Sequence, residues 1–244
     1  MKLNLFFLRL KKLLLILSSA RLLSCLIQRG VFAGVEHRAL LNESLKTIID
    51  IGANKGQFAL AVRKWAKNAR IISFEPLCGP SKIFKAVFKN DANVHLNIAA
   101  IGPTSQRSLM HLSEHEDSSS LLPIGPKQSI YFPGTHEKGV VEIDVAPLDS
   151  FLHADDIELP SMLKLDVQGF EMEALKGCES LFTRINLIYC ECSFIELYSD
   201  QKLAHDIIQW LYDRQFILIG VFNTSYDFSG QAIQADFLFE RQVL

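Results

Sequence analysis

The sequence has 244 residues, of which 49% are hydrophobic and 21% charged, and this is enough for one sizeable α/β domain with an appendage. The net charge of −2 offers no basic surplus for nucleic acid, so no nucleic-acid partner is expected. The five cysteines include no C-x-x-C pair and the seven histidines no H-E-x-x-H spacing, which predicts reduced thiols in the cytoplasm and no structural metal site.

Residues 1–40 differ from the rest and are predicted to form a basic, apolar helical appendage. Leu and Ile are dense up to Gln28, but charged residues interrupt them too often for the roughly 20 apolar residues of a membrane span: Arg9, Lys11, Lys12 and Arg21. A signal peptide is only partly matched, by an apolar run before Ser18-Ser19-Ala20, and the cysteine usage argues against export. The segment is expected either to pack on the domain or on a second copy of the chain, or to lie on an anionic membrane surface. The location is therefore cytoplasmic, with or without peripheral membrane contact.

Residues 50–56, Asp-Ile-Gly-Ala-Asn-Lys-Gly, follow a strand-like run and open a helix-like one. Such a turn is typical of nucleotide binding, because Gly52 and Gly56 let backbone N–H groups approach a ligand and the helix N-terminus adds partial positive charge. Asn54 is a residue that tolerates positive φ. Asp50 would repel a pyrophosphate at this strand tip, but it would attract the cationic amino-acid tail of S-adenosylmethionine.

Glu75 ends the next strand-like run, 70–74, and lies 25 residues after Asp50. In dinucleotide-binding folds an acid about 20 residues after the glycine turn meets a ribose diol. Two acids at adjacent strand tips favour one adenosyl cofactor, S-adenosylmethionine. The predicted cofactor-binding residues are Asp50, Gly52, Asn54, Gly56, Phe74 and Glu75. The alternative is a capping Asp and a solvated Glu in an ordinary α/β protein.

From residue 41 onward one domain is expected, in which strand and helix signals alternate as in a parallel sheet with crossover helices. Strands are predicted at 47–51, 70–74, 94–99, 162–166, 186–191, 216–222 and 235–239, and helices at 57–67, 80–89, 170–176 and 201–214. Gly177 is predicted to cap the third helix. The gap between the last two strands is too polar and short for a crossover helix, so these strands should pair antiparallel and give the seven-stranded sheet a reversed edge.

Residues 107–147 interrupt this alternation with two strand-like pieces, 108–112 and 140–145, around a tract rich in Ser, Pro, Gly and His. Connections of this length inside a compact domain are usually lids, binding loops or disordered excursions. We therefore expect a substrate-side insertion.

A second motif covers residues 163–171, Leu-Lys-Leu-Asp-Val-Gln-Gly-Phe-Glu. Lys164 lies inside a predicted central strand and requires a buried acidic partner, for which Glu191 on the neighbouring strand is the candidate. Asp166 falls at the carboxyl tip of its strand, where ligands of open α/β sheets bind. The structural alternatives are a helix cap for Asp166 and a first-turn acid for Glu171.

These motifs in order resemble the successive signatures of the FkbM-type methyltransferases: residues 50–56, Phe74-Glu75-Pro76, residues 146–151, residues 164–171 with Leu175-Lys176-Gly177, and Glu191 to Phe194. The resemblance covers roughly residues 45–222. It implies a Rossmann-like, seven-stranded, mostly parallel sheet with an antiparallel last strand (the class I methyltransferase fold). It also implies transfer of a methyl group from S-adenosylmethionine, commonly to a hydroxyl of a sugar, glycan or secondary metabolite. Ala146-Pro147 departs from the pattern, where the family more often has a Thr before the Leu-Asp pair.

A neutral hydroxyl is a poor nucleophile, so the reaction needs a base aligned with the acceptor. Asp166 is the first candidate, followed by Glu171 and Glu191, and the insertion adds His111 and His115. Two other classes stay open: a noncatalytic S-adenosylmethionine-binding protein, and another nucleotide-binding Rossmann-like protein such as a dehydrogenase. The acids near the acceptor favour catalysis, and the incomplete glycine pattern disfavours a dehydrogenase.

Overall fold

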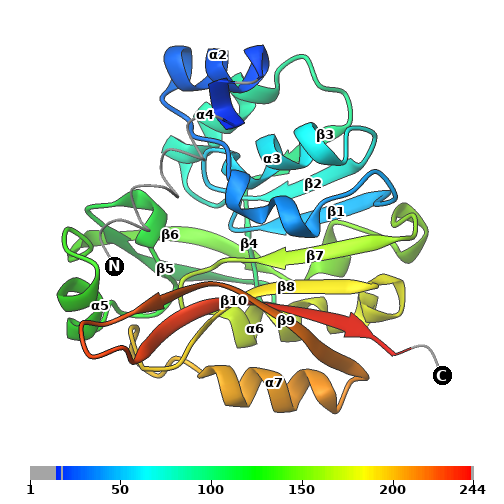
Figure 1. Cartoon of the computed structure of the whole chain (residues 1–244). Coiled ribbons are helices and arrows are strands. Elements are labelled where there is room, and N and C mark those ends of the chain that lie inside the picture. Colours follow the sequence, from blue (N-terminus) through cyan, green and yellow to red (C-terminus); the bar gives the residue numbers. More distant parts are fainter. Residues whose placement is uncertain (1–14, 18, 243–244) are drawn as a thin grey trace.

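A seven-stranded sheet forms the centre of the computed structural model, which describes residues 15–17 and 19–242 (Figure 1). Its strand order is β3-β2-β1-β7-β8-β10-β9. The strands are β1 Thr47–Ile51, β2 Arg70–Phe74, β3 Val94–Asn97, β7 Ser161–Leu165, β8 Leu187–Ser193, β9 Phe216–Tyr226 and β10 Ala232–Arg241. β1 pairs in parallel with β2 and β7, whereas β10 is antiparallel to both β8 and β9. The predicted α/β fold with an antiparallel last strand is confirmed.

The sequence predicted that the reversed strand would lie at the edge of the sheet, and the structure does not place it there. β10 lies between β8 and β9, so the outermost strand is β9. In the β9–β10 hairpin, β10 is the strand next to β8. Its apolar residues, including Phe237 and Phe239, are buried where it pairs with β8. Burial of that aromatic strand explains why the last strand takes the inner position.

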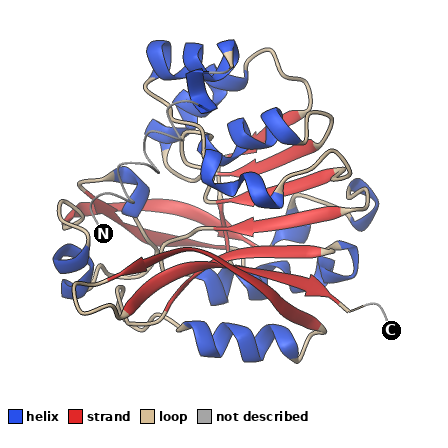
Figure 2. Ribbon diagram, viewed as in Figure 1, coloured by secondary structure: helices blue, strands red, loops and turns tan. Residues whose placement is uncertain are grey.

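Helices cover both faces of the sheet (Figure 2). On one face lie α3 Gln57–Trp65, α4 Cys78–Phe88, α2 Ala20–Arg29 and the short 3₁₀ helix η1 Val35–Leu40. The other face is covered by α6 Glu171–Cys178 and α7 Ala204–Tyr212. Successive strand residues point to opposite faces of the sheet. Ile48 therefore packs in the core on the side of α3 and α4, and Ile49 in the core on the side of α6 and α7.

Gly177 does not end α6, contrary to the prediction. The helix continues to Cys178, and a Cβ at position 177 would stand 2.4 Å from the carbonyl oxygen of Gly102. The glycine therefore permits a close approach between α6 and the backbone after β4 Ala100–Ile101.

The two strands of the insertion join β4 in a second, three-stranded sheet of order β4-β6-β5, with β5 Gln106–Ser113 antiparallel to β6 Glu137–Ala146. Between these strands the chain forms the 3₁₀ helix η2 Glu116–Ser118 and the helix α5 Pro126–Tyr131.

The N-terminal segment is described from residue 15 onward, apart from residue 18; the rest of the predicted appendage lies outside the described residues. Part of this segment is buried in the same hydrophobic core as α3, through Ile16, Leu22, Val35 and Leu40. Over the part of the chain that the structure describes, no helix is both long and apolar enough to cross a membrane.

Candidate functional site

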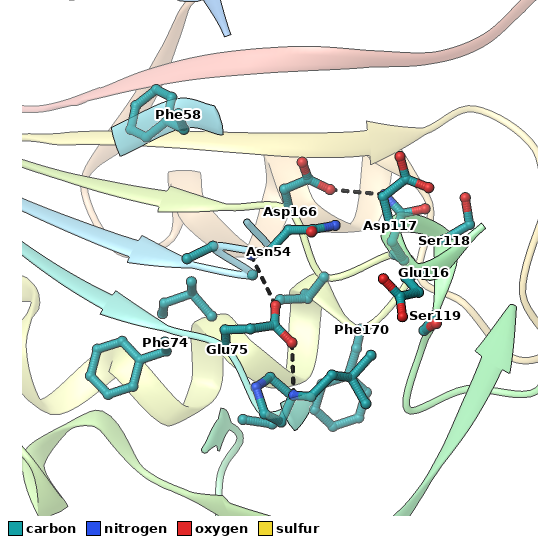
Figure 3. A pocket seen from close by; sticks show the side chains of 18 of the residues that line it. Asn54, Phe58, Phe74, Glu75, Glu116, Asp117, Ser118, Ser119, Asp166 and Phe170 are labelled. Atoms are coloured by element: carbon teal, nitrogen blue, oxygen red, sulfur yellow. Dashed lines mark hydrogen bonds between the residues drawn. The ribbon is translucent and has the colours of Figure 1, made fainter. Parts of the chain in front are cut away.

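A cavity of about 490 Å³ opens at the carboxyl ends of β1, β2 and β7. Its walls include the turn after β1, the end of β2, the loop after β7, and the connection between β5 and β6 (Figure 3). The N-terminal segment adds Gly34, Glu36 and His37. The insertion contributes Met110, residues 115–119, Leu121, Gln128, Phe132 and Thr135, so it does border the site.

The turn after β1 has the backbone geometry that its residues predict. Gly52, Asn54 and Gly56 have φ of 78°, 47° and 92°. At Gly52 a Cβ would stand 1.9 Å from the carbonyl oxygen of Asp166, so only glycine lets the β1 turn pack on the tip of β7.

Glu75 is fixed to that turn. Its carboxylate accepts the N–H of Asn54 at 2.9 Å and the N–H of Leu77 at 2.8 Å (Figure 3). Burial raises the pKa of Glu75 to about 7, although both N–H donors favour the charged form. A carboxylate held in this way, on the cavity wall, is placed to accept hydrogen bonds from a diol.

Asp50, not Glu191, is the buried partner of Lys164. The two residues face each other in register on β1 and β7, and their side-chain atoms Oδ1 and Nζ are 3.1 Å apart. Burial raises the pKa of Asp50 despite this pairing. Burial alone would lower the pKa of Lys164, but Asp50 and Asp166 raise it, and the net shift is upward. Lys164 lines the cavity, whereas Asp50 lies beneath it.

Asp166 follows the last residue of β7 and lines the cavity, as predicted from its place at the strand tip. The amide of Gln168 donates to Asp166 Oδ1 at 2.8 Å and to Glu191 Oε2 at 2.9 Å, while its carbonyl accepts the Tyr198 hydroxyl at 2.8 Å. Gln168 has a positive φ of 55°. The strained backbone at Gln168 thus places its side-chain amide between Asp166, Glu191 and Tyr198. This hydrogen bonding fixes the carboxylate of Asp166.

The other two predicted catalytic acids do not line the cavity. Glu171 is buried and accepts the N–H groups of Val167 and Gly169, both at 3.1 Å, which ties the turn after β7 to the start of α6. Glu191 accepts amide protons from Gln168 and, at 2.8 Å, Gln234. Burial raises the pKa of Glu191 well above its ordinary value.

Of the two histidines of the insertion that were candidates, His111 and His115, the second borders the cavity and the first does not. His111 Nδ1 lies 2.8 Å from Glu137 Oε2, on the strand pair itself. The sequence interpretation did not find His37, Gln168 or Gln234. Gln168 stood within the second motif, where its positive φ was not foreseeable, and the other two carry no local signal because only the fold brings them to β7.

The residues that line the cavity fit S-adenosylmethionine. Asn54 Oδ1 and Gln57 Oε1 are buried acceptors that have no hydrogen-bond partner among the described residues, and both residues border the cavity. Such acceptors suit the ammonium group of an amino-acid tail. Phe74, Leu77, Ala99 and Ile101 provide an apolar wall near Glu75, which suits a purine ring whose ribose is bound by the carboxylate.

Comparison with known proteins gives a consistent picture. The family model "Methyltransferase FkbM domain" matches residues 50–218. Hexuronic acid methyltransferase AglP of Haloferax volcanii is 26% identical over 95 residues, which is 35% of this chain and 40% of that protein. The 2-O-methyltransferase NoeI of Sinorhizobium fredii is 24% identical over 181 residues, or 71% of this chain and 74% of that protein. The aligned part thus spans less than half the length of the archaeal relative.

Two solved structures are similar at low sequence identity. Precorrin-6y C5,15-methyltransferase from Geobacter metallireducens is 12% identical with a TM-score of 0.45, covering 85% of this chain and 86% of that one. Aeropyrum pernix fibrillarin with bound S-adenosyl-L-methionine is 11% identical with a TM-score of 0.43, covering 89% of this chain and 73% of that one.

Proposed function

The chain belongs to the FkbM family of S-adenosylmethionine-dependent methyltransferases, and from this premise we propose that it methylates a hydroxyl group of a sugar or glycan. Two relatives support this acceptor class, since one is named for a hexuronic acid and the other for 2-O-methylation. When bound, S-adenosylmethionine supplies an electrophilic methyl group on a sulfonium. The remaining work of the protein is to align an oxygen with that carbon and to receive a proton.

We propose that the cofactor occupies the half of the cavity between the β1 turn and β2. In this arrangement Glu75 accepts the ribose hydroxyls and Phe74 borders the adenine. Gly52, Asn54 and Gly56 shape the turn around the amino-acid tail. Asp50 acts from below, because it holds the Lys164 ammonium group whose Nζ donates to the carbonyl of Gly52 at 3.1 Å.

Asp166 is the proposed base. The observation that carries this role is the fixed orientation of its carboxylate on the cavity wall, with Gln168 holding Oδ1 at 2.8 Å. Glu191 acts through Gln168, and Glu171 acts through the backbone of residues 167 and 169. Both are therefore proposed as positioning residues.

The decisive variant is Asp166→Asn, which keeps the shape and removes the negative charge. For a base we expect single-turnover methylation to fall by about 10²–10⁴-fold, while the affinity for S-adenosylhomocysteine stays within a few-fold. The acceptors are a panel of methyl hexosides and the glycans extracted from the source cells, with tritiated S-adenosylmethionine as donor.

Asp213→Asn is the matched control, because Asp213 follows α7 and is exposed. It should leave both quantities unchanged. If Asp166→Asn keeps near-normal turnover and stability, Asp166 is not the base. If the wild type binds the cofactor product but methylates nothing, a noncatalytic binding role replaces the proposal.

We also propose that the chain divides into an N-terminal segment, 1–40, and a methyltransferase domain, 41–244, whose part 107–147 lies on the acceptor side. The segment offers features suited to an anionic surface: Ile27 and Phe32 are 73% and 59% exposed, beside Arg29. Recovery of the protein on vesicles containing anionic lipid tests peripheral contact. Sedimentation tests the alternative, self-association.

A further inference from the structure

A cavity-lining histidine comes from outside the region that the family model matches. His37 lies in η1, before residue 50, and borders the cavity together with Lys164 and Asp166. The N–H of Gly34 donates to the carbonyl of Gln57 at 2.8 Å, which fixes the segment to the start of α3. A Cβ at Gly34 would stand 2.8 Å from His37 Cδ2, so the glycine makes room for the imidazole.

Aromatic rings hold the imidazole in place. Phe58 and Tyr189 contact it edge-on, with ring centroids at 5.3 and 5.5 Å. The orientation of His37 is thus set by packing as well as by hydrogen bonds.

A chain of hydrogen bonds fixes the proton position on that ring. Asp236 Oδ2 accepts from Asn223 Nδ2 at 2.8 Å and from the Tyr189 hydroxyl at 2.7 Å. Since the single Tyr189 proton is directed to Asp236, the Tyr189 oxygen accepts from His37 Nδ1, 3.0 Å away. The neutral imidazole then carries its proton on Nδ1, and Nε2 presents a lone pair. Within residues 15–17 and 19–242, Nε2 has no hydrogen-bond partner.

Burial outweighs the charges around His37 and leaves the ring neutral at pH 7. Burial lowers its pKa, and Lys164 on β7 acts in the same direction. Asp236 on β10, Glu36 on η1 and Asp166 after β7 oppose this shift, but the net direction is downward. A neutral ring with Nε2 unprotonated is a hydrogen-bond acceptor.

We propose that His37 is an acceptor-binding residue, whose Nε2 accepts a hydrogen bond from a hydroxyl next to the one that is methylated. This inference rests on the proposed function, in which Asp166 receives the proton of the reacting hydroxyl. A sugar presents such neighbouring hydroxyls, and a site with two separate acceptors selects them as a pair. The N-terminal segment thereby takes part in choosing the acceptor.

The test compares the wild type with His37→Ala, His37→Gln and Tyr189→Phe in the methylation assay described above. For His37→Ala we expect the KM for the acceptor to rise by about 10-fold, kcat to stay within about 5-fold, and S-adenosylhomocysteine affinity to be unchanged. His37→Gln should recover part of the loss, since its amide oxygen can accept. His205→Ala is the control, because that histidine is exposed on α7.

The ring itself is examined by ¹⁵N NMR of the wild type at pH 7, where we expect Nδ1 protonated and Nε2 bare, with this preference weakened in Tyr189→Phe. A ring protonated on Nε2 would overturn the proposal. So would an unchanged acceptor KM in His37→Ala, or a kcat loss of about 100-fold at unchanged KM. An inactive wild type would instead overturn the proposed function, and this inference with it.

Discussion

The carboxylate of Glu75 accepts two backbone N–H groups, and burial raises its pKa to about 7. This carboxylate is where the ribose is proposed to bind. Below that pKa the side chain is protonated, and above it the carboxylate is free to accept two hydroxyl protons. We therefore expect adenosine to bind about tenfold more tightly at pH 8 than at pH 6. Adenosine is the right probe, since it has no group that titrates in this range, and calorimetry gives the affinity.

Glu75→Gln provides the comparison, because an amide does not titrate. Its adenosine affinity should be lower and nearly independent of pH. If the variant shows the same slope as the wild type, some other group is responsible for the pH dependence.

The individual site residues differed in how far the sequence could reveal them. Asp166 and Glu75 follow apolar strand residues directly, so strand order alone brings them to one edge of the sheet. The partner of Lys164 was predicted wrongly, because two acids were available on neighbouring strands and only the register places Asp50 opposite it. His37 lies in a short 3₁₀ helix without periodicity, and its contacts with Tyr189 and Phe58 are wholly long-range.

Among the elements, α6 is held against β4 by glycine backbones. The would-be Cβ of Gly177 lies within 2.4 Å of the Gly102 carbonyl, which is backbone and cannot rotate away. Gly177→Ala is therefore expected to lower the free energy of unfolding by about 1–3 kcal/mol through overpacking. This exceeds the gain of up to about 1 kcal/mol that Ala brings to a helix interior.

Urea unfolding measures the difference. Lys176→Ala on the same helix, at an exposed position, should change the free energy of unfolding by no more than about 0.5 kcal/mol. Equal stability of Gly177→Ala and the wild type would show that the backbone after β4 yields easily.

The element pattern itself was readable from the sequence because buried parallel strands such as β1 and β7 are short apolar runs bounded by turn residues. The ends of the strands were harder to predict from the sequence. β9 extends to Tyr226, well beyond 222, because its pairing with β10 continues as far as the pair Ala232 and Tyr226. The place of β10 inside the sheet depends on tertiary pairing with β8, which local preference does not encode.

At the scale of the whole molecule, the predicted insertion became a second sheet with a structured connection. Its two strands were visible in the sequence, but η2 and α5 were not, because they are short and lie in a polar tract. What the tract contacts follows only from the closed fold: Glu116 Oε2 lies 3.3 Å from Lys55 Nζ, and the Tyr198 hydroxyl contacts the carbonyl of Ser118 at 3.1 Å.

Those two contacts have a kinetic consequence. Glu116 contacts the turn proposed for the cofactor, and Ser118 contacts Tyr198, which also holds Gln168 beside the proposed base. We propose that the stretch 116–118 moves as one unit and uncovers the cofactor and acceptor parts of the cavity together. S-adenosylhomocysteine then leaves through the same opening by which the next acceptor enters. An acceptor that binds before the product has left would trap the product. Initial rates should accordingly decline at high acceptor concentration. Lys55→Met, which frees one attachment, should relieve that inhibition, whereas equal inhibition in both proteins would mean that the two compartments open independently.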